Sequence, residues 1–182
     1  ENGRWKQKHP GELLGAKFIE PYFGSALHTW TSVLGITLLG LSVGYLSGGI
    51  LSKKYNKVKN LYLIIAIAAL LISLMPFVAS FVLEFTLFLD IQIGAVISSL
   101  ILIFPPICLL GMTTPWIIKE LSSDKDVSGK TTGWTYALSS IGGIVSAVGL
   151  GFFLISALGL RVSTGVVALG LASAPLVYFL QV

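Results

Sequence analysis

Charged residues are scarce in this sequence. Only 11% of its 182 residues are Asp, Glu, Lys or Arg, whereas a soluble domain carries about 25%. Hydrophobic residues make up 54% of the chain, and the mean hydropathy is +0.88. Because a soluble fold does not hide this much apolar surface, the composition predicts an integral membrane protein.

The residues that usually build metal or catalytic sites are also few. The single cysteine, Cys108, lies inside an apolar run and permits no internal disulfide. His9 and His28 have no cysteine or histidine neighbours at metal-ligand spacing. Asp124 and Asp126 lie in a hydrophilic loop on either side of a lysine, rather than as a pair on one face. We therefore expect no metal, no cofactor and no catalytic residue in this chain.

The net charge of +4 does not indicate a nucleic-acid partner. Most of the excess lies in residues 4–8 and 53–59, and the second of these stretches is flanked by apolar runs. Basic residues beside a membrane helix are explained by the bilayer itself. The lipid bilayer is therefore the first expected partner.

The chain divides into a basic tail, residues 1–10, and a transmembrane domain, residues 11–182. Residues 11–28 are mixed in character and predict a short interfacial helix that ends at Pro21. Uncharged apolar segments follow, each close to the roughly 20 residues that cross the hydrocarbon core. The five predicted spans are about 29–51, 61–83, 91–118, 131–158 and 162–182. The predicted fold class is an all-α polytopic membrane protein.

Small residues recur every four positions in two of these spans. This spacing puts them on one helix face and predicts a flat surface for close helix packing. A substrate path along the same faces is the alternative. The residues are Gly40, Gly44 and Gly48 in the first span, and Gly143, Ala147 and Gly151 in the fourth.

The third predicted span contains the adjacent prolines Pro105 and Pro106. Two missing backbone donors predict a bend or a break there, which is either a structural kink or a place where backbone groups meet a substrate. No charged residue lies within any predicted span, which argues against proton- or cation-coupled transport. Glu12 and Lys17, before the first span, remain as candidate charged groups on a substrate path or in a structural ion pair.

Lysines predict the orientation in the membrane. The loop 52–60 is basic and has no acid, and the loop 119–130 also carries several lysines. By the positive-inside rule both loops are cytoplasmic, so the C-terminus is cytoplasmic and the short loops 84–90 and 159–161 face outward. The lysines of the first loop are Lys53, Lys54, Lys57 and Lys59.

The basic tail conflicts with this topology. It would lie outside the cell, although it is as basic as a cytoplasmic segment, and residues 9–28 contain no apolar run that could carry it across. We therefore expect a sixth membrane helix, missing between the tail and Glu12. An intact subunit mass of 19.4 kDa would contradict that expectation.

Three stretches together resemble one protein family. They are ELLGAKFIEPYFGSALHTWTSVLGITLLGLSVGYLSGGILS (12–52), PPICLLGMTTPWIIKEL (105–121) and GWTYALSSIGGIVSAVGLGFFLISALGLR (133–161). In order and spacing they are similar to the bacterial membrane-embedded spermidine synthase-like proteins, or fused major-facilitator/spermidine synthases. The resemblance implies a half major-facilitator-like helical bundle in the bacterial inner membrane, with a helix before the position of Glu12.

The loop after the first span resembles the major-facilitator loop between helices two and three in a degenerate form. Ser52 stands where that loop has an acid, and Asn56 stands where it has its second glycine. The acid latches the loop to neighbouring helices in that family. The resemblance therefore implies a loop that has kept its role in topology and lost its role in gating.

In the fused family a soluble aminopropyltransferase domain follows the helices, and this sequence contains no such domain. The first hypothesis is therefore a non-catalytic membrane subunit or anchor that packs against other membrane subunits. The second is a small homodimeric transporter or flippase-like protein for a polyamine or a lipid. The third is the membrane part of a polyamine enzyme whose catalytic domain is on another chain.

Overall fold

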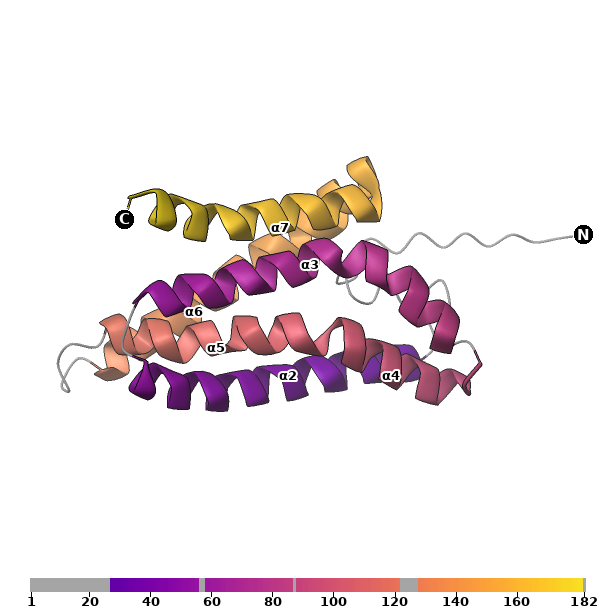
Figure 1. Ribbon diagram of the computed structural model, residues 1–182, viewed down its shortest axis with the longest axis horizontal. Coiled ribbons are helices and arrows are strands. Elements are labelled where there is room, and N and C mark those ends of the chain that lie inside the picture. Colours follow the sequence, from indigo (N-terminus) through magenta and orange to yellow (C-terminus); the bar gives the residue numbers. More distant parts are fainter. Residues whose placement is uncertain (1–26, 56–57, 87, 122–127, 182) are drawn as a thin grey trace, which may run out of the picture.

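The computed structural model describes residues 27–55, 58–86, 88–121 and 128–181, and throughout these ranges the regular structure is helical, without strands. The predicted all-helical class is confirmed. The elements are α2 (Leu27–Lys54), α3 (Val58–Thr86), α4 (Ile91–Leu102), α5 (Phe104–Leu121), α6 (Ser128–Val148), the π-helix η2 (Gly149–Leu154) and α7 (Ile155–Gln181) (Figure 1).

Three helical segments are long and apolar enough to cross a membrane: Thr29–Lys54, Val58–Thr86 and Gly129–Leu180. The bent pair Gln92–Leu102 and Phe104–Leu121 raises the number to four if it forms one span. The predicted count of five is not confirmed, because residues 129–180 count as a single candidate of 52 residues, although this segment is broken at Gly159.

Large apolar side chains cover the outside of the helices. On α3, Phe77, Phe81 and Phe85 recur at four-residue spacing with exposed fractions of 82%, 75% and 72%. Soluble monomers rarely expose a continuous apolar stripe of this kind. This surface is compatible with insertion into a membrane, where lipid tails would cover it.

The helices pack in a defined order. α5 lies against α2 and α3, α4 packs on α2 and α3, and α7 packs on α3. Figure 1 shows the C-terminal end of α7 at the same end of the molecule as the end of α2, the start of α3 and the end of α5. Lys54, Lys59 and Lys119 therefore lie at one end, whereas Glu84 and Arg161 lie toward the other.

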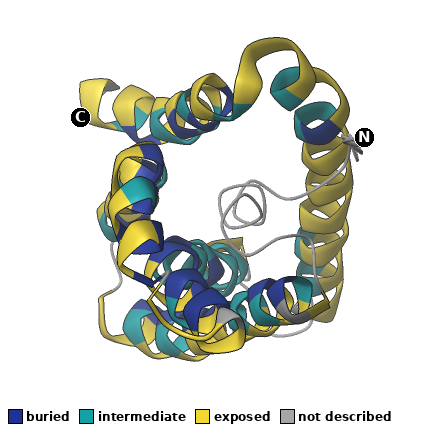
Figure 2. Ribbon diagram, turned by 90° about the vertical axis from the view of Figure 1, so that its right-hand side faces the viewer, coloured by how far each residue is buried: buried dark blue, intermediate teal, exposed yellow. Residues whose placement is uncertain are grey.

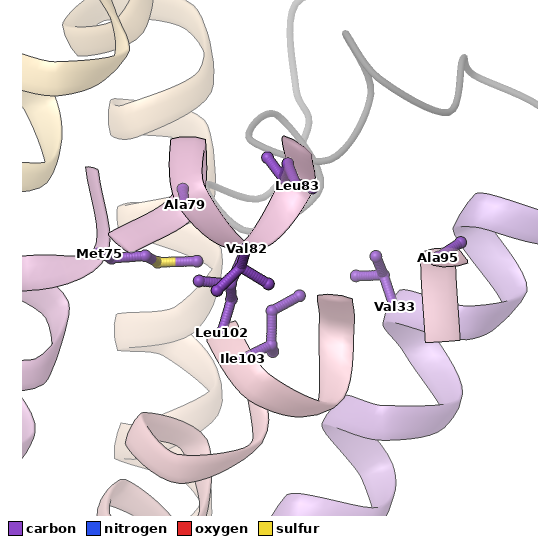
Figure 3. Packing of buried hydrophobic residues seen from close by; sticks show 8 residues of the cluster. All are labelled: Val33, Met75, Ala79, Val82, Leu83, Ala95, Leu102 and Ile103. Atoms are coloured by element: carbon purple, nitrogen blue, oxygen red, sulfur yellow. The ribbon is translucent and has the colours of Figure 1, made fainter. Parts of the chain in front are cut away.

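A small hydrophobic core joins α2, α3 and α4. Figure 3 shows Leu102 and Ile103 below Val82, while Val33 of α2 faces Ala95 of α4. All of these side chains are at most 8% exposed. The α3–α4 contact also contains a buried hydrogen bond of 2.8 Å between the hydroxyls of Thr86 and Ser98. The core therefore fixes the α3–α4 hairpin against α2.

The break expected at the proline pair lies between α4 and α5. α4 ends at Leu102, α5 begins at Phe104, and the two helices are bent by 48°. Pro105 and Pro106 fall in the first turn of α5, where backbone amides have no acceptor within the helix and a missing N–H costs little. The prolines thus begin a new helix instead of interrupting one.

A second break lies inside α7. Gly159 has φ 76° and ψ 171°, a non-helical conformation, whereas the rest of α7 is helical. Positive φ is strained for a residue with a Cβ and is readily adopted by glycine. The turn predicted at residues 159–161 is therefore present as one glycine, with α7 continuing beyond it.

Several predictions concern residues outside the described ranges. They are the basic tail 1–10, the mixed segment with Glu12 and Lys17, the sixth helix expected before it, and Asn56 and Lys57 in the loop after α2.

Candidate functional site

The glycines of α2 face α5. A Cβ added at Gly40 would lie 3.1 Å from Cγ2 of Ile107, and one added at Gly48 would lie 2.6 Å from Cα of Met112. At Gly44 an added Cβ would clash with the carbonyl oxygen of Cys108. Real Cβ atoms essentially never approach another atom to less than 3.0 Å, so Gly44 and Gly48 leave room only for hydrogen, whereas the contact at Gly40 is tight. The sequence spacing thus corresponds to the line along which α2 and α5 touch.

The partner helix contributes a glycine of its own. A Cβ added at Gly111 of α5 would lie 3.2 Å from Cα of Gly44. The two backbones therefore meet directly at this point, as in other membrane helix pairs built on small residues. Gly111 was not among the predicted packing residues, although it follows the proline pair by five residues.

The small residues of α6 have a different environment. No atom of the described residues lies within 4 Å of a Cβ added at Gly143, and Ala147 is exposed, whereas Gly151 in η2 is buried. Every residue from 136 to 148 is exposed. Figure 2 shows this helix exposed along most of its length. Among the described elements α6 contacts only α5 and η2.

A lysine contact lies at the end where α2 finishes. The Nζ of Lys119 on α5 donates a hydrogen bond to the carbonyl oxygen of Ser52. Ser52 is 3% exposed, and its hydroxyl donates to the carbonyl of Gly49 at 3.1 Å. Together with Lys53 and Lys54 in the last turn of α2, this places positive charge at a helix C-terminus, which the helix dipole favours by about 0.3–1 kcal/mol per cation.

This role of Lys119 was not predicted from the sequence, where the residue belongs to the basic loop 119–130. The available signal was that Lys119 is the basic residue of the last turn of α5, at the same predicted membrane face as Ser52. Ser52 stands where the resembled loop has an acid, and here its backbone carbonyl accepts from a cation instead.

The proline pair lines neither of the two cavities between α3 and α7. Pro106 is buried and Pro105 is half-buried at the start of α5. Their observed effect is the bend between α4 and α5.

A groove runs between α3 and α7, and we call it the α3–α7 groove. Its long part has a volume of about 530 Å³, and a second part of about 370 Å³ continues it, because Ser73 and Gly165 line both. Most residues of the long part are apolar and many are small. They include Ala66, Ala69, Leu70, Ala168, Ala172 and Leu176. The second part is lined by Ser73, Pro76, Phe77, Ser80, Arg161 and Gly165.

Arg161 gives this groove its charge. Among the described residues that line its two parts, Arg161 is the only cation and none is acidic. Neither an ion pair nor a hydrogen bond joins its guanidinium to another side chain within the described ranges. From the sequence, Arg161 belongs only to the short outward-facing loop 159–161, because the helix that completes the groove is far away along the chain.

The described residues contain no cluster of three or more His, Cys, Asp or Glu side chains that could hold a metal ion. Comparison of the whole chain with protein-family models, with curated proteins and with solved structures gives no match. The resemblance to the spermidine synthase-like family therefore stays a prediction from the residues.

Proposed function

We propose that this chain is a non-catalytic, multi-pass subunit of the bacterial inner membrane. It packs through α6 against the helices of another membrane subunit, with its C-terminus in the cytoplasm. In this arrangement it acts as an anchor and carries out no chemistry itself.

The proposed topology has five spans. A straight helix of 52 residues, the length of the Gly129–Leu180 segment, would be about 78 Å long at 1.5 Å per residue. The hydrocarbon core is only about 30 Å thick. Two crossings separated at Gly159 fit this length, and the bent α4–α5 pair supplies one more crossing. The shared position of the lysine-rich turn and the C-terminus at one end supports the cytoplasmic assignment.

The exposed face of α6 is the observation that carries the proposal. Its residues 136–148 are exposed over more than three turns, and among the described elements α6 contacts only α5 and η2. Lipid alone could cover such a face, but small residues are enriched where membrane helices approach each other closely. Gly143 and Ala147 are small residues of this kind on the exposed face of α6. We therefore expect a helix of a partner subunit to pack against this face.

Site-directed cross-linking tests the proposal. Because Cys108 is the single cysteine, Cys108→Ala gives a cysteine-free background. A photo-activatable maleimide on Ile144→Cys, in the exposed face of α6, is expected to yield one defined cross-linked product in native membranes, identified by mass spectrometry. The matched control is Leu38→Cys on α2, whose native side chain is equally exposed at 65% and should yield none.

The possible outcomes are distinct. A product that joins the chain to a different multi-pass protein, also retained in native mass spectrometry, supports the proposal. A product of twice the chain mass favours the homodimeric transporter, and a cross-linked nucleotide-fold protein favours the polyamine-enzyme reading. Lipid adducts alone at Ile144→Cys would rule the anchor proposal out.

A further inference from the structure

The α3–α7 groove has the dimensions of one lipid tail. Its α7 wall runs from Gly165 to Phe179, a separation of about 21 Å at 1.5 Å per residue. This is longer than half of the hydrocarbon core of about 30 Å, so the groove spans the depth of a single leaflet. Its lining is mostly apolar, with Ala66, Ala69, Ala168 and Ala172 leaving space that larger side chains would fill.

One end of the groove attracts an anion. Arg161 lines that end, two residues after Gly159. Because α7 restarts after the non-helical glycine, Arg161 also lies in the first turn of a helix, where the dipole favours negative charge. The nearest acid along α3 is Glu84, four residues beyond Ser80, and no ion pair joins it to Arg161 within the described ranges.

Two hydroxyls face the same end. Ser73 and Ser80 line it from α3. On α7, Ser163 and Thr164 donate to the carbonyls of Gly159 and Leu160 at 2.7 and 2.8 Å. Ser73 and Ser80 make no such bond to a described residue, so their O–H groups are available to a ligand. A guanidinium with two free hydroxyls suits a phosphodiester, which offers several acceptor oxygens.

We propose that the α3–α7 groove binds an anionic phospholipid. The phosphodiester lies at Arg161, Ser73 and Ser80, and one acyl chain lies between α3 and α7. On the proposed topology Arg161 is at the outer face, so the lipid comes from the outer leaflet of the inner membrane. The inference rests on the proposed membrane location, although it does not require a partner subunit on α6.

Lipid retention by the purified chain tests this inference. The chain is exchanged into detergent micelles containing equal amounts of phosphatidylglycerol and phosphatidylcholine, and bound lipid is counted by native mass spectrometry. The wild-type chain is expected to retain one phosphatidylglycerol in preference to phosphatidylcholine. Arg161→Gln should weaken phosphatidylglycerol binding by about 10-fold or more, because a charge-assisted contact is lost. The matched control Lys130→Gln removes one positive charge outside the groove and should bind like wild type.

A second pair of variants tests the tail site. Ala172→Phe fills the groove and is expected to reduce retention of both lipids. Ala174→Phe adds the same ring at an exposed position on the same helix and should not. If Arg161→Gln or Ala172→Phe does not fold, as judged by size-exclusion chromatography, Ser80→Ala replaces it, with an expected loss of several-fold.

Three results would overturn the inference. One is equal retention of both lipids by the wild-type chain, and another is unchanged phosphatidylglycerol binding in Arg161→Gln. The third is that inorganic phosphate raises the thermal unfolding midpoint of the chain as much as phosphatidylglycerol does. That result would mean that the site binds a free anion. Alkaline carbonate extraction of native membranes separately tests insertion. A chain that is extracted as soluble protein contradicts the proposed function whatever the lipid result.

Discussion

At Gly44 and Gly111 two helix backbones touch with no side chain between them. Such contact raises the number of favourable van der Waals pairs, which matter most in lipid because no hydrophobic effect drives helices together there. It also means that neither glycine tolerates a larger residue, since any added carbon must push α5 away from α2.

We therefore expect Gly44→Ala to destabilise the chain by about 1–3 kcal/mol, the usual range for overpacking. Gly49→Ala is the matched control, because no atom of another described element lies within 4 Å of a Cβ there. Alanine at that helical position should be neutral or stabilising by up to about 1 kcal/mol. Denaturant-induced unfolding in micelles, followed by circular dichroism, measures both. Equal effects at the two positions would disprove close packing at Gly44.

Trp116 offers a second test at this scale. It is 1% exposed and packs against Leu61 and Ile64, while its Nε1 has no acceptor among the described residues. A buried N–H without a partner costs about 1–3 kcal/mol. Trp116→Phe should therefore change the free energy of unfolding by less than about 1.5 kcal/mol. Removing the unpaired N–H offsets the contacts that are lost with the larger ring.

Trp116→Ala is the comparison, and it should cost about 3–5 kcal/mol because it leaves a cavity. The midpoint of thermal unfolding in the same detergent distinguishes the two variants. A loss in Trp116→Phe as large as that in Trp116→Ala would mean that the indole N–H has an acceptor in the native protein.

Residue spacing predicted some of these contacts and not others. The four-residue glycine repeat of α2 identified the face that meets α5, because periodicity alone determines which residues share a helix face. The same repeat in α6 identified a face that no described helix covers. Gly111, Lys119 and Arg161 could not be assigned, since their roles depend on a second helix whose position the sequence does not state.

At the scale of the elements, the breaks decide the architecture. The proline pair separates α4 from α5, and Gly159 turns the chain within α7. Proline and glycine chemistry predicted both places, because proline lacks a backbone N–H and glycine readily adopts the positive φ that ends a helix. The π-helix η2 has no comparable signature in the sequence, since an i→i+5 turn arises from packing and insertion rather than from one residue type.

We expect Gly159→Ala to destabilise the chain by about 1 kcal/mol or more, because its φ of 76° is strained for any residue with a Cβ. Gly170→Ala on the same helix is the control, since no atom of another described element lies within 4 Å of its added Cβ and its φ is helical. Unfolding in micelles again measures the difference. If Gly159→Ala is as stable as its control, the turn between the last two proposed crossings must lie elsewhere.

At the scale of the whole molecule, the ends of the bundle differ in charge. Lysines gather where α2, α5 and α7 finish, and the opposite end carries Glu84, Asp90 and Arg161. The sequence predicted this distribution because apolar spans and loop charges are local properties. It could not predict which helices neighbour each other, or that α6 would remain largely uncovered, because these follow from long-range packing.

The orientation has a direct test in the Cys108→Ala background. Phe88→Cys, at a position that is 91% exposed, should react with a membrane-impermeant maleimide in intact spheroplasts. Lys54→Cys, at the other end, should react only after the membrane is permeabilised. The reverse pattern would place the C-terminus outside the cell, and labelling of both positions in intact spheroplasts would contradict a closed membrane-spanning bundle.

The six-residue π segment Gly149–Leu154 has a consequence for the phase of the helices around it. Each residue of an α-helix advances by about 100°, so one residue accommodated in a wider turn rotates the chain between η2 and the break at Gly159 by that amount relative to α6. We expect deletion of a single residue from η2 to restore an α-helical phase and to change the direction in which the chain leaves α6 for the rest of α7. The register of this one turn therefore bears on where α7 meets α3.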